Sequence, residues 1–279
     1  MKPQAFEYKR IEKVSEALQW LHENGENARI LAGGQSLVIL LNMRLAQPAW
    51  LLDISRCAEL NYLRQEKDML CIGASTTQAQ LQYWPELAKT VPLLAEAIPF
   101  ISHYQVRNRG TVAGSIAHAD PSAELPLCLA TLGGRVVLRS SKKSRDLTAA
   151  QFQQGMLTTA KQTNEMVTEV RFPVAVQGHG YAFDEFALRR GDFAIVACAV
   201  QAGPERIRLG IGGVADKPVV VEWNRNDSAS FGQRLNDLAW QLNAQDDQHA
   251  SAAYRRHLVR ELGANTIETA LSRCAGTKE

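Results

Sequence analysis

The chain has 279 residues, of which 46% are hydrophobic and 22% are charged, and its formal net charge is +2. These values are typical of a soluble globular protein, and they exclude the strongly basic surface that nucleic-acid-binding and membrane-surface proteins carry. A chain of this length buries a full core and usually divides into two domains.

The N-terminal segment and the apolar runs predict the compartment. Residues 1–10 (MKPQAFEYKR) do not contain the apolar core of a secretory signal. The longest apolar runs are far shorter than the roughly 20 residues that a helix needs to cross a bilayer. We therefore expect a cytoplasmic protein with no membrane insertion and no nucleic-acid partner.

Five cysteines are scattered along the sequence: Cys57, Cys71, Cys128, Cys198 and Cys274. Their number is odd and no two form a CxxC pair, so neither a disulfide framework nor an iron–sulfur or zinc site is favoured. Buried free thiols in a reducing compartment are the simpler interpretation.

The first 56 residues alternate between strand and helix patterns. We expect strands at residues 5–8, 28–31 and 50–54, and helices at residues 14–23 and 36–45. Val14, Leu18 and Leu21 follow the i, i+4, i+7 spacing of a helix, and Gly25 can cap its end. A β-α-β-α-β order favours parallel strands and places the glycines of residues 33–34 at the carboxyl end of a strand.

Residues 57–175 have a more mixed pattern. We expect strands at residues 69–73, 135–140 and 165–172, helices at residues 76–84, 92–102 and 125–132, and a polar connection at residues 142–146. This spacing predicts an α+β lobe rather than further βαβ repeats.

Residues 173–180 carry proline and glycine without periodicity, which predicts a linker. Beyond it we expect strands at residues 181–188, 193–202 and 206–211, and helices at residues 231–242, 250–262 and 267–274. A small three-stranded sheet with three helices would account for this end of the chain. We interpret Gly210, Gly212 and Gly213 as a turn at the end of a strand.

Two segments combine small residues with hydroxyl groups: residues 31–36 (LAGGQS) and residues 105–124 (QVRNRGTVAGSIAHADPSAE). Small residues let the backbone approach a ligand closely, and exposed N–H groups can then hold an anion. Two such loops suggest a ligand whose central, negatively charged group is bound from both sides. The pyrophosphate of a dinucleotide is the candidate. The alternative is two tight turns whose glycines only supply positive φ. Neither segment contains the GxGxxG fingerprint of nicotinamide dinucleotides.

With these segments in view, the chain resembles the flavoprotein (medium) subunit of the molybdenum hydroxylases, the family of xanthine dehydrogenase and aerobic carbon monoxide dehydrogenase. The resemblance covers nearly the whole chain. Four motifs carry it, in this order: AGGQSL with the downstream LLDI, VRNRGTVAGSIAHADPSAELP, ALRRGDFAIVACAV and SAAYRRHL.

The resemblance implies an α+β fold with a two-lobed FAD-binding domain of the p-cresol methylhydroxylase type. This domain would span residues 1–175, with a small βαβ lobe at about residues 1–56 and a mixed α+β lobe at about residues 57–175. A small C-terminal domain would follow at residues 176–279. FAD would lie between the two lobes.

The resemblance also implies which residues contact FAD. One side of the pyrophosphate would meet the first loop, at Ala32, Gly33, Gly34, Gln35, Ser36 and Leu37. The other side would meet Thr111, Gly114 and Ser115 of the second loop. Glu124 would contact the sugar or ribityl hydroxyls, and Val167 would lie against the flavin. No catalytic residue and no metal ligand is expected in this chain, and His118 with Asp120 is too small a set for a metal site.

Three positions depart from the family pattern. Ala113 stands where a second glycine is usual, and its methyl group is compatible with the loop only if φ is negative and the ligand does not touch it. Glu185 stands where lysine is frequent, which would remove a favourable charge near the flavin or its phosphates. Glu124 replaces aspartate and reaches one methylene further.

The resemblance implies an oxidoreductase in which this chain accepts electrons from iron–sulfur clusters into FAD and passes them to an external acceptor. The molybdopterin cofactor and the [2Fe-2S] clusters would be held by a large and a small partner subunit, in a dimer of heterotrimers. One alternative is a stand-alone oxidase or reductase that binds FAD non-covalently with the same fold. Another is a scaffold that has lost its flavin and serves only in assembly.

Overall fold

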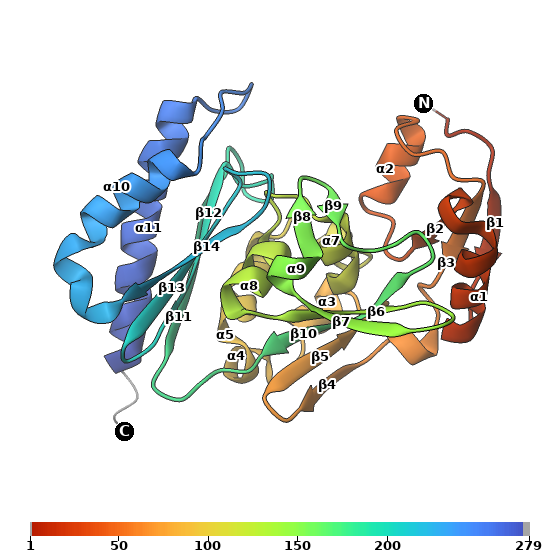
Figure 1. Ribbon diagram of the computed structural model, residues 1–279, viewed down its shortest axis with the longest axis horizontal. Helices are drawn as coiled ribbons and strands as arrows, with labels where there is room; N and C mark the ends of the chain where they lie inside the picture. Colours follow the sequence, from red (N-terminus) through yellow and green to blue (C-terminus); the bar gives the residue numbers. More distant parts are fainter. Residues whose placement is uncertain (1, 276–279) are drawn as a thin grey trace.

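The computed structural model describes residues 2–275. Met1 and residues 276–279, which begin and end the two predicted domains, lie outside the described residues. Three bodies follow one another along the long axis of the molecule: a small N-terminal lobe, a central lobe, and a C-terminal sheet with its helices (Figure 1).

The N-terminal lobe is a three-stranded parallel sheet in the order β1-β3-β2. Its elements are β1 (Glu7–Arg10), α1 (Val14–Asn24), η1 (Gly25–Asn27), β2 (Ala28–Leu31), α2 (Leu37–Asn42) and β3 (Trp50–Asp53). Val14, Leu18 and Leu21 lie on the buried face of α1, and the Gly25 N–H caps the helix by donating to the Leu21 carbonyl. The parallel pairing expected for this lobe is confirmed.

The central lobe is built on a five-stranded sheet in the order β4-β5-β10-β6-β7, with antiparallel neighbours throughout. Its strands are β4 (Leu63–Glu66), β5 (Met69–Gly73), β6 (Arg135–Arg139), β7 (Ser144–Thr148) and β10 (Met166–Pro173), and β8 (Gln153–Gly155) and β9 (Thr158–Thr159) form a separate hairpin. The polar connection predicted at residues 142–146 is wrong, because β7 begins at Ser144. Two of the strands that the sequence analysis missed, β4 and β7, lie at the sheet edges. Each contains only one apolar residue, so neither shows apolar alternation.

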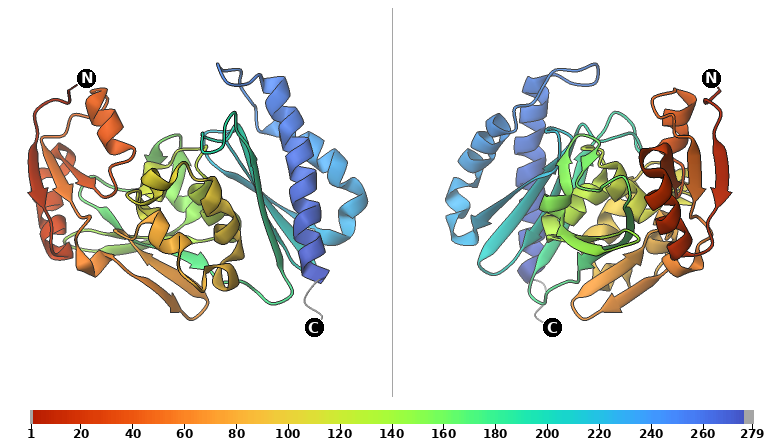
Figure 2. Two further views of the ribbon diagram at one scale, coloured as in Figure 1. Left: turned by 180° about the vertical axis from the view of Figure 1, so that it is seen from behind. Right: turned by 45° about the vertical axis from the view of Figure 1, so that its right-hand side comes forward.

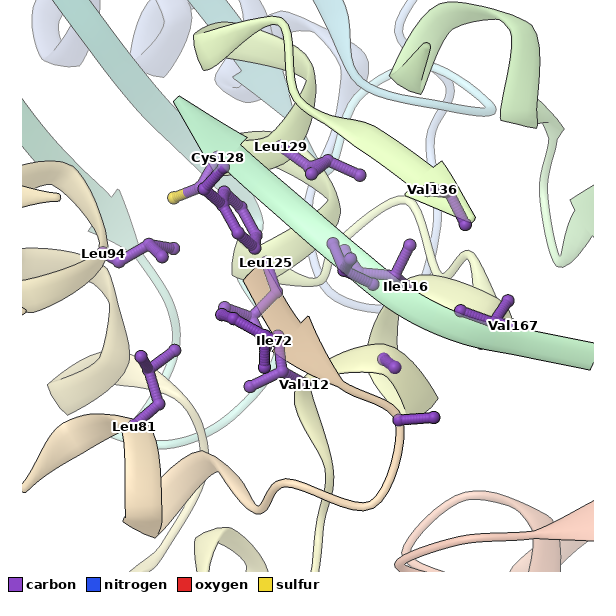
Figure 3. Close-up of a cluster of buried hydrophobic side chains, with 14 of the residues drawn as sticks. Ile72, Leu81, Leu94, Val112, Ile116, Leu125, Cys128, Leu129, Val136 and Val167 are labelled. Atoms are coloured by element: carbon purple, nitrogen blue, oxygen red, sulfur yellow. The ribbon is translucent and has the colours of Figure 1, made fainter. Parts of the chain in front are cut away.

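Short helices fill the central lobe, and α7 and α8 form its core. The helices are η2 (Ala58–Leu60), α3 (Gln78–Gln82), α4 (Leu87–Thr90), α5 (Pro92–Ala97), η3 (Ile98–Phe100), α6 (Tyr104–Arg107), α7 (Val112–His118), α8 (Glu124–Leu132) and α9 (Ala149–Phe152). Val112 and Ile116, one turn apart on α7, and Leu125 and Leu129 on α8 are fully buried. Figure 3 shows these side chains gathered around β5 and β10.

The C-terminal part contains a four-stranded antiparallel sheet, with its strands in sequence order. Its elements are β11 (Gly180–Phe186), β12 (Val196–Ala202), β13 (Arg206–Gly212), β14 (Val219–Asn224), η4 (Arg225–Ser230), α10 (Phe231–Gln241) and α11 (Ala252–Ala275). Both α10 and α11 cover the sheet face that points away from the central lobe, as Figures 1 and 2 show. The described part of the chain has no helix with the length and hydrophobicity needed to cross a membrane.

The prediction of three strands and three helices is therefore wrong on both counts. The half-buried apolar run at the start of β14 adds a fourth strand. The two helices predicted at residues 250–262 and 267–274 are one helix, α11, that continues through Gly263. Gly263 does not end the helix. It allows α11 to pack closely against α10, because a Cβ there would lie 2.6 Å from Leu235 Cδ2 of α10.

The helix α8 packs directly on the bare backbone of β13. Gly210 and Gly212 are strand residues, not the predicted strand-end turn, and only Gly213, with φ +80°, follows the strand. A Cβ on Gly210 would lie 2.1 Å from Thr131 Oγ1 and 2.9 Å from Leu127 Cδ1. The missing side chain thus lets the C-terminal sheet approach the central lobe closely.

Two hydrophobic clusters divide the buried residues. The first runs through both lobes and includes Phe183, Ala197 and Ala199 of the C-terminal sheet. The second lies between the opposite face of that sheet and the helices α10 and α11, and it includes Cys198 and Val200. Strand alternation explains the division, because successive side chains of β12 point to opposite faces. The predicted domain boundary at residue 175 stays a prediction.

We expect Gly210→Ala to lower the free energy of unfolding by about 1–3 kcal/mol, because the new methyl group would overlap α8. Gly155→Ala is the matched control, since Gly155 is also a strand residue and a Cβ there would meet nothing within 4 Å. Denaturant unfolding of the two variants measures the difference. Equal stability of both would show that α8 and β13 are not held as close as described.

Candidate cofactor-binding site

The first candidate loop leaves the carboxyl end of β2 and leads into α2. Gly34 has a φ of +76°, a conformation that glycine adopts without strain. Among the described residues, none accepts a hydrogen bond from the backbone N–H groups of residues 33–36. The Ser36 hydroxyl makes no capping bond to α2 either. Half-buried donors without partners at the start of a helix are suited to an anion.

The second candidate loop ends in the N-cap of α7. The Thr111 hydroxyl accepts a hydrogen bond of 2.9 Å from the Gly114 N–H. The backbone of the loop is tied to the start of α3 and to the residues just before it, since the Gln78 N–H donates to the Gly110 carbonyl and the Val112 N–H donates to the Thr76 carbonyl. These bonds hold the loop rigidly, and they also mean that the Gly114 N–H is already used.

The fold brings the two loops into direct contact. A Cβ on Gly33 would lie 2.2 Å from the Arg109 carbonyl oxygen and 2.7 Å from the Gly110 Cα. A Cβ on Gly114 would lie 2.7 Å from Thr111 Oγ1 and 4.0 Å from the Ala32 Cβ. The residues expected on the two sides of a pyrophosphate therefore do face one another. Their contact with FAD stays a prediction.

The two arginines of the second loop differ in role. Arg107 donates hydrogen bonds to Gln82 Oε1 and to the carbonyls of Ile101 and Ser102. It thus steadies the turn before the loop. Arg109 is exposed, and no described residue pairs with its guanidinium. Of the two, Arg109 is the side chain that is free to reach a phosphate.

Ala113 does not disturb the site. It lies inside α7, it is not among the residues with positive φ, and only 2% of it is exposed. Its methyl group belongs to the hydrophobic cluster of the two lobes. The second glycine of the family pattern is therefore replaced here without placing an atom in the space between the loops.

Val167 and Glu124 lie deeper than the loops. Val167 is 7% exposed and packs beside Ile116 and Val136 (Figure 3). A register shift in β10 directly follows it, between Val167 and Glu169, and such bulges are common beside active sites. Glu124 is 5% exposed, and burial raises its pKa to about 7. The contacts of both with FAD stay predictions.

The structure also reveals two supporting residues that the sequence patterns did not indicate. Thr76 and Gln78 hold the second loop through backbone hydrogen bonds, although the pattern at residues 76–84 indicated only the start of a helix. No local signal could reveal a pairing between segments so far apart. In residues 2–275 no group of three or more His, Cys, Asp or Glu side chains could hold a metal ion.

Comparisons with known proteins agree with this geometry. Residues 4–175 match the family described as the FAD binding domain in molybdopterin dehydrogenase. The chain is 35% identical to the 6-hydroxypseudooxynicotine dehydrogenase complex subunit alpha of Paenarthrobacter nicotinovorans, over 100% of this chain and 99% of that one. It is 33% identical to the carbon monoxide dehydrogenase medium chain of Hydrogenophaga pseudoflava, over 99% and 100% of the two chains.

Solved structures share the whole fold. A carbon monoxide dehydrogenase from Hydrogenophaga pseudoflava that lacks the Mo-pyranopterin moiety matches with a TM-score of 0.91 and 30% identity, over 98% of this chain and 100% of that chain. Quinoline 2-oxidoreductase from Pseudomonas putida 86 matches with a TM-score of 0.89 and 32% identity, over 100% of both chains. The chain therefore belongs to the family of FAD binding domains in molybdopterin dehydrogenases.

Proposed function

We propose that this chain is the flavoprotein subunit of a multi-subunit molybdenum-containing hydroxylase or dehydrogenase. It binds FAD non-covalently, takes electrons from iron–sulfur clusters on a partner subunit and passes them to an external acceptor. The observation that carries the proposal is the contact between two glycine-containing loops, one of which has a run of unpaired N–H groups, in a chain of an FAD-binding family.

The protein residues bind and orient the cofactor. The N–H groups of residues 33–36 and the Ser36 hydroxyl would hold one side of the pyrophosphate. On the other side, the Thr111 hydroxyl still has its hydrogen to donate, because its oxygen is the acceptor in the bond to Gly114. Bound FAD supplies the ability to accept electrons singly and to release them in pairs.

The metal centres would lie on a large molybdenum-cofactor subunit and a small iron–sulfur subunit, in a dimer of heterotrimers. Two observations support this division. Cys57, Cys71, Cys128 and Cys198 are each buried, and burial raises the pKa of Cys71 to about 11, so its thiol is not poised to bind a cluster. The relatives described above are named as a complex subunit and a medium chain.

We expect Gly33→Ala to lower the affinity for FAD at least tenfold. The added methyl group would lie 2.2 Å from the Arg109 carbonyl oxygen, so the two loops must move apart. Gly232→Ala is the control, because a Cβ there would meet nothing within 4 Å. The flavin absorbance per chain of the purified complexes, with circular dichroism as a check of folding, measures the effect. Full flavin content in a folded Gly33→Ala complex would contradict the proposed site.

We expect the chain, purified with its natural partners, to show an oxidised-flavin absorption band together with iron–sulfur bands. Mild denaturation should release free FAD, because no covalent link is expected. Copurification with two unlike subunits separates an electron-transfer subunit from a stand-alone oxidase. A complex without flavin, or a flavin-containing chain that never associates with metal-containing subunits, would count against the proposed function.

A further inference from the structure

The side chain of one buried glutamine makes no hydrogen bond. Gln78 is the first residue of α3 and is 5% exposed. Its Oε1 is buried and has no partner within the part of the chain that the structure describes. Its Nε2 donates to no described residue either. Because buried polar groups are nearly always hydrogen-bonded, a whole amide without partners requires an explanation.

This amide lies against the second cofactor loop. A Cβ on Gly110 would lie 3.1 Å from Gln78 Oε1 and 3.3 Å from Gln78 Cδ, so the side chain occupies the space beside that glycine. The backbone of the same residue is bonded there as well, since the Gln78 N–H donates to the Gly110 carbonyl over 2.8 Å. The start of α3 therefore fixes the position of Gly110 through both its backbone and its side chain.

Gly110 is also the point that the first loop reaches. A Cβ on Gly33 would lie 2.7 Å from the Gly110 Cα and 2.2 Å from the Arg109 carbonyl oxygen. The first loop, the second loop and the start of α3 thus meet at one glycine. Backbone atoms in such close contact leave no side chain that could adjust, so a displacement of Gly110 is transmitted to Gly33.

The other glutamine side chains of α3 are hydrogen-bonded. Gln80 accepts a bond of 2.8 Å from the Thr77 N–H, and Gln82 accepts one of 3.0 Å from Arg107. Both are more exposed than Gln78. An amide without partners costs more free energy when it is buried, so this arrangement is the reverse of the one that stability alone favours. Residues that break such a rule are typical of functional sites.

A flavin nucleotide carries both kinds of partner that this amide lacks. Oε1 requires a donor, and Nε2 requires an acceptor. The phosphate oxygens of FAD accept hydrogen bonds, and the hydroxyl groups of the ribose and ribityl chains beside them can donate. Nε2 is not among the fully enclosed atoms of the described residues, whereas Oε1 is. The donor end of the Gln78 amide is therefore the end that a ligand reaches first.

We propose that Gln78 is a cofactor-positioning residue, whose side-chain amide completes its hydrogen bonds only when the flavin nucleotide is bound. In the bound state these bonds hold Gly110 in place, and through it the contact with Gly33. The inference rests on the proposed function, because the ligand is the cofactor assigned there. It gives the side chain of Gln78 a role beyond the backbone bond that anchors the second loop.

The proposal requires Gln78→Met to change stability and cofactor affinity in opposite directions. Methionine keeps the approximate shape of glutamine and removes the amide. Without flavin, the substitution removes an unpaired buried group, so the folded chain becomes more stable. With flavin, it removes hydrogen bonds that the nucleotide would complete, so binding weakens. A residue that only fills space would change neither property, and one that is already bonded within the chain would lower its stability.

The test has two measurements on the full-length protein. Flavin fluorescence gives the dissociation constant of FAD from the complex after reversible removal of the cofactor, and we expect Gln78→Met to raise it roughly tenfold. Thermal unfolding of the flavin-free chain should show a rise of about 2–4 °C for the same variant.

Gln153→Met is the matched control. Gln153 is 3% exposed, but its Nε2 donates to the Pro126 carbonyl over 3.0 Å. Loss of that bond should lower the unfolding temperature and leave the dissociation constant of FAD unchanged. The two substitutions are chemically identical, so a difference between them reports the bonding state of each amide.

Two results would overturn the inference: a Gln78→Met complex that binds FAD as tightly as the wild type, or a flavin-free Gln78→Met chain that is less stable than the wild type. Either result leaves the proposed function intact as long as the wild-type complex binds flavin. A wild-type complex that binds no FAD would instead reject the proposed function, and the inference with it.

Discussion

The close approach of Gly33 to the Arg109 carbonyl is the contact on which the site depends. Only glycine permits it, because any side chain would begin 2.2 Å from that oxygen. The two loops come from different lobes, so this contact sets the position of one lobe against the other. It also places a run of unpaired N–H groups opposite the N-cap of α7, where Thr111 has closed its own hydrogen bond. Neither loop alone would be more than a tight turn.

A second close approach holds the C-terminal sheet to the same segment of chain. Gly210 and Gly212 leave the surface of β13 bare, and α8 lies on it. The segment from α6 to α8 therefore contacts the first loop at one end and the C-terminal sheet at the other.

Sequence patterns predicted the elements whose buried face is continuous, such as α1, α8 and β5. They missed the edge strands β4 and β7, each of which contains only one apolar residue and so leaves no periodicity to detect. They also divided α11 at Gly263, because a glycine in a polar run is a usual helix end, whereas here it accommodates Leu235. The residues of both loops were predictable from their composition. Their contact was not, since it depends on how two lobes pack.

The two departures at Ala113 and Glu185 show which family features can be transferred from sequence. Ala113 looks like a lost ligand contact, but α7 turns its methyl group into the core, so the backbone of the loop is unchanged. Glu185 looks like a lost positive charge, but the fold half-buries its side chain, and burial with the charges of Glu124 and Asp184 raises the pKa of its carboxyl group to about 8. Backbone geometry follows the motif, whereas charge balance follows from the folded neighbours.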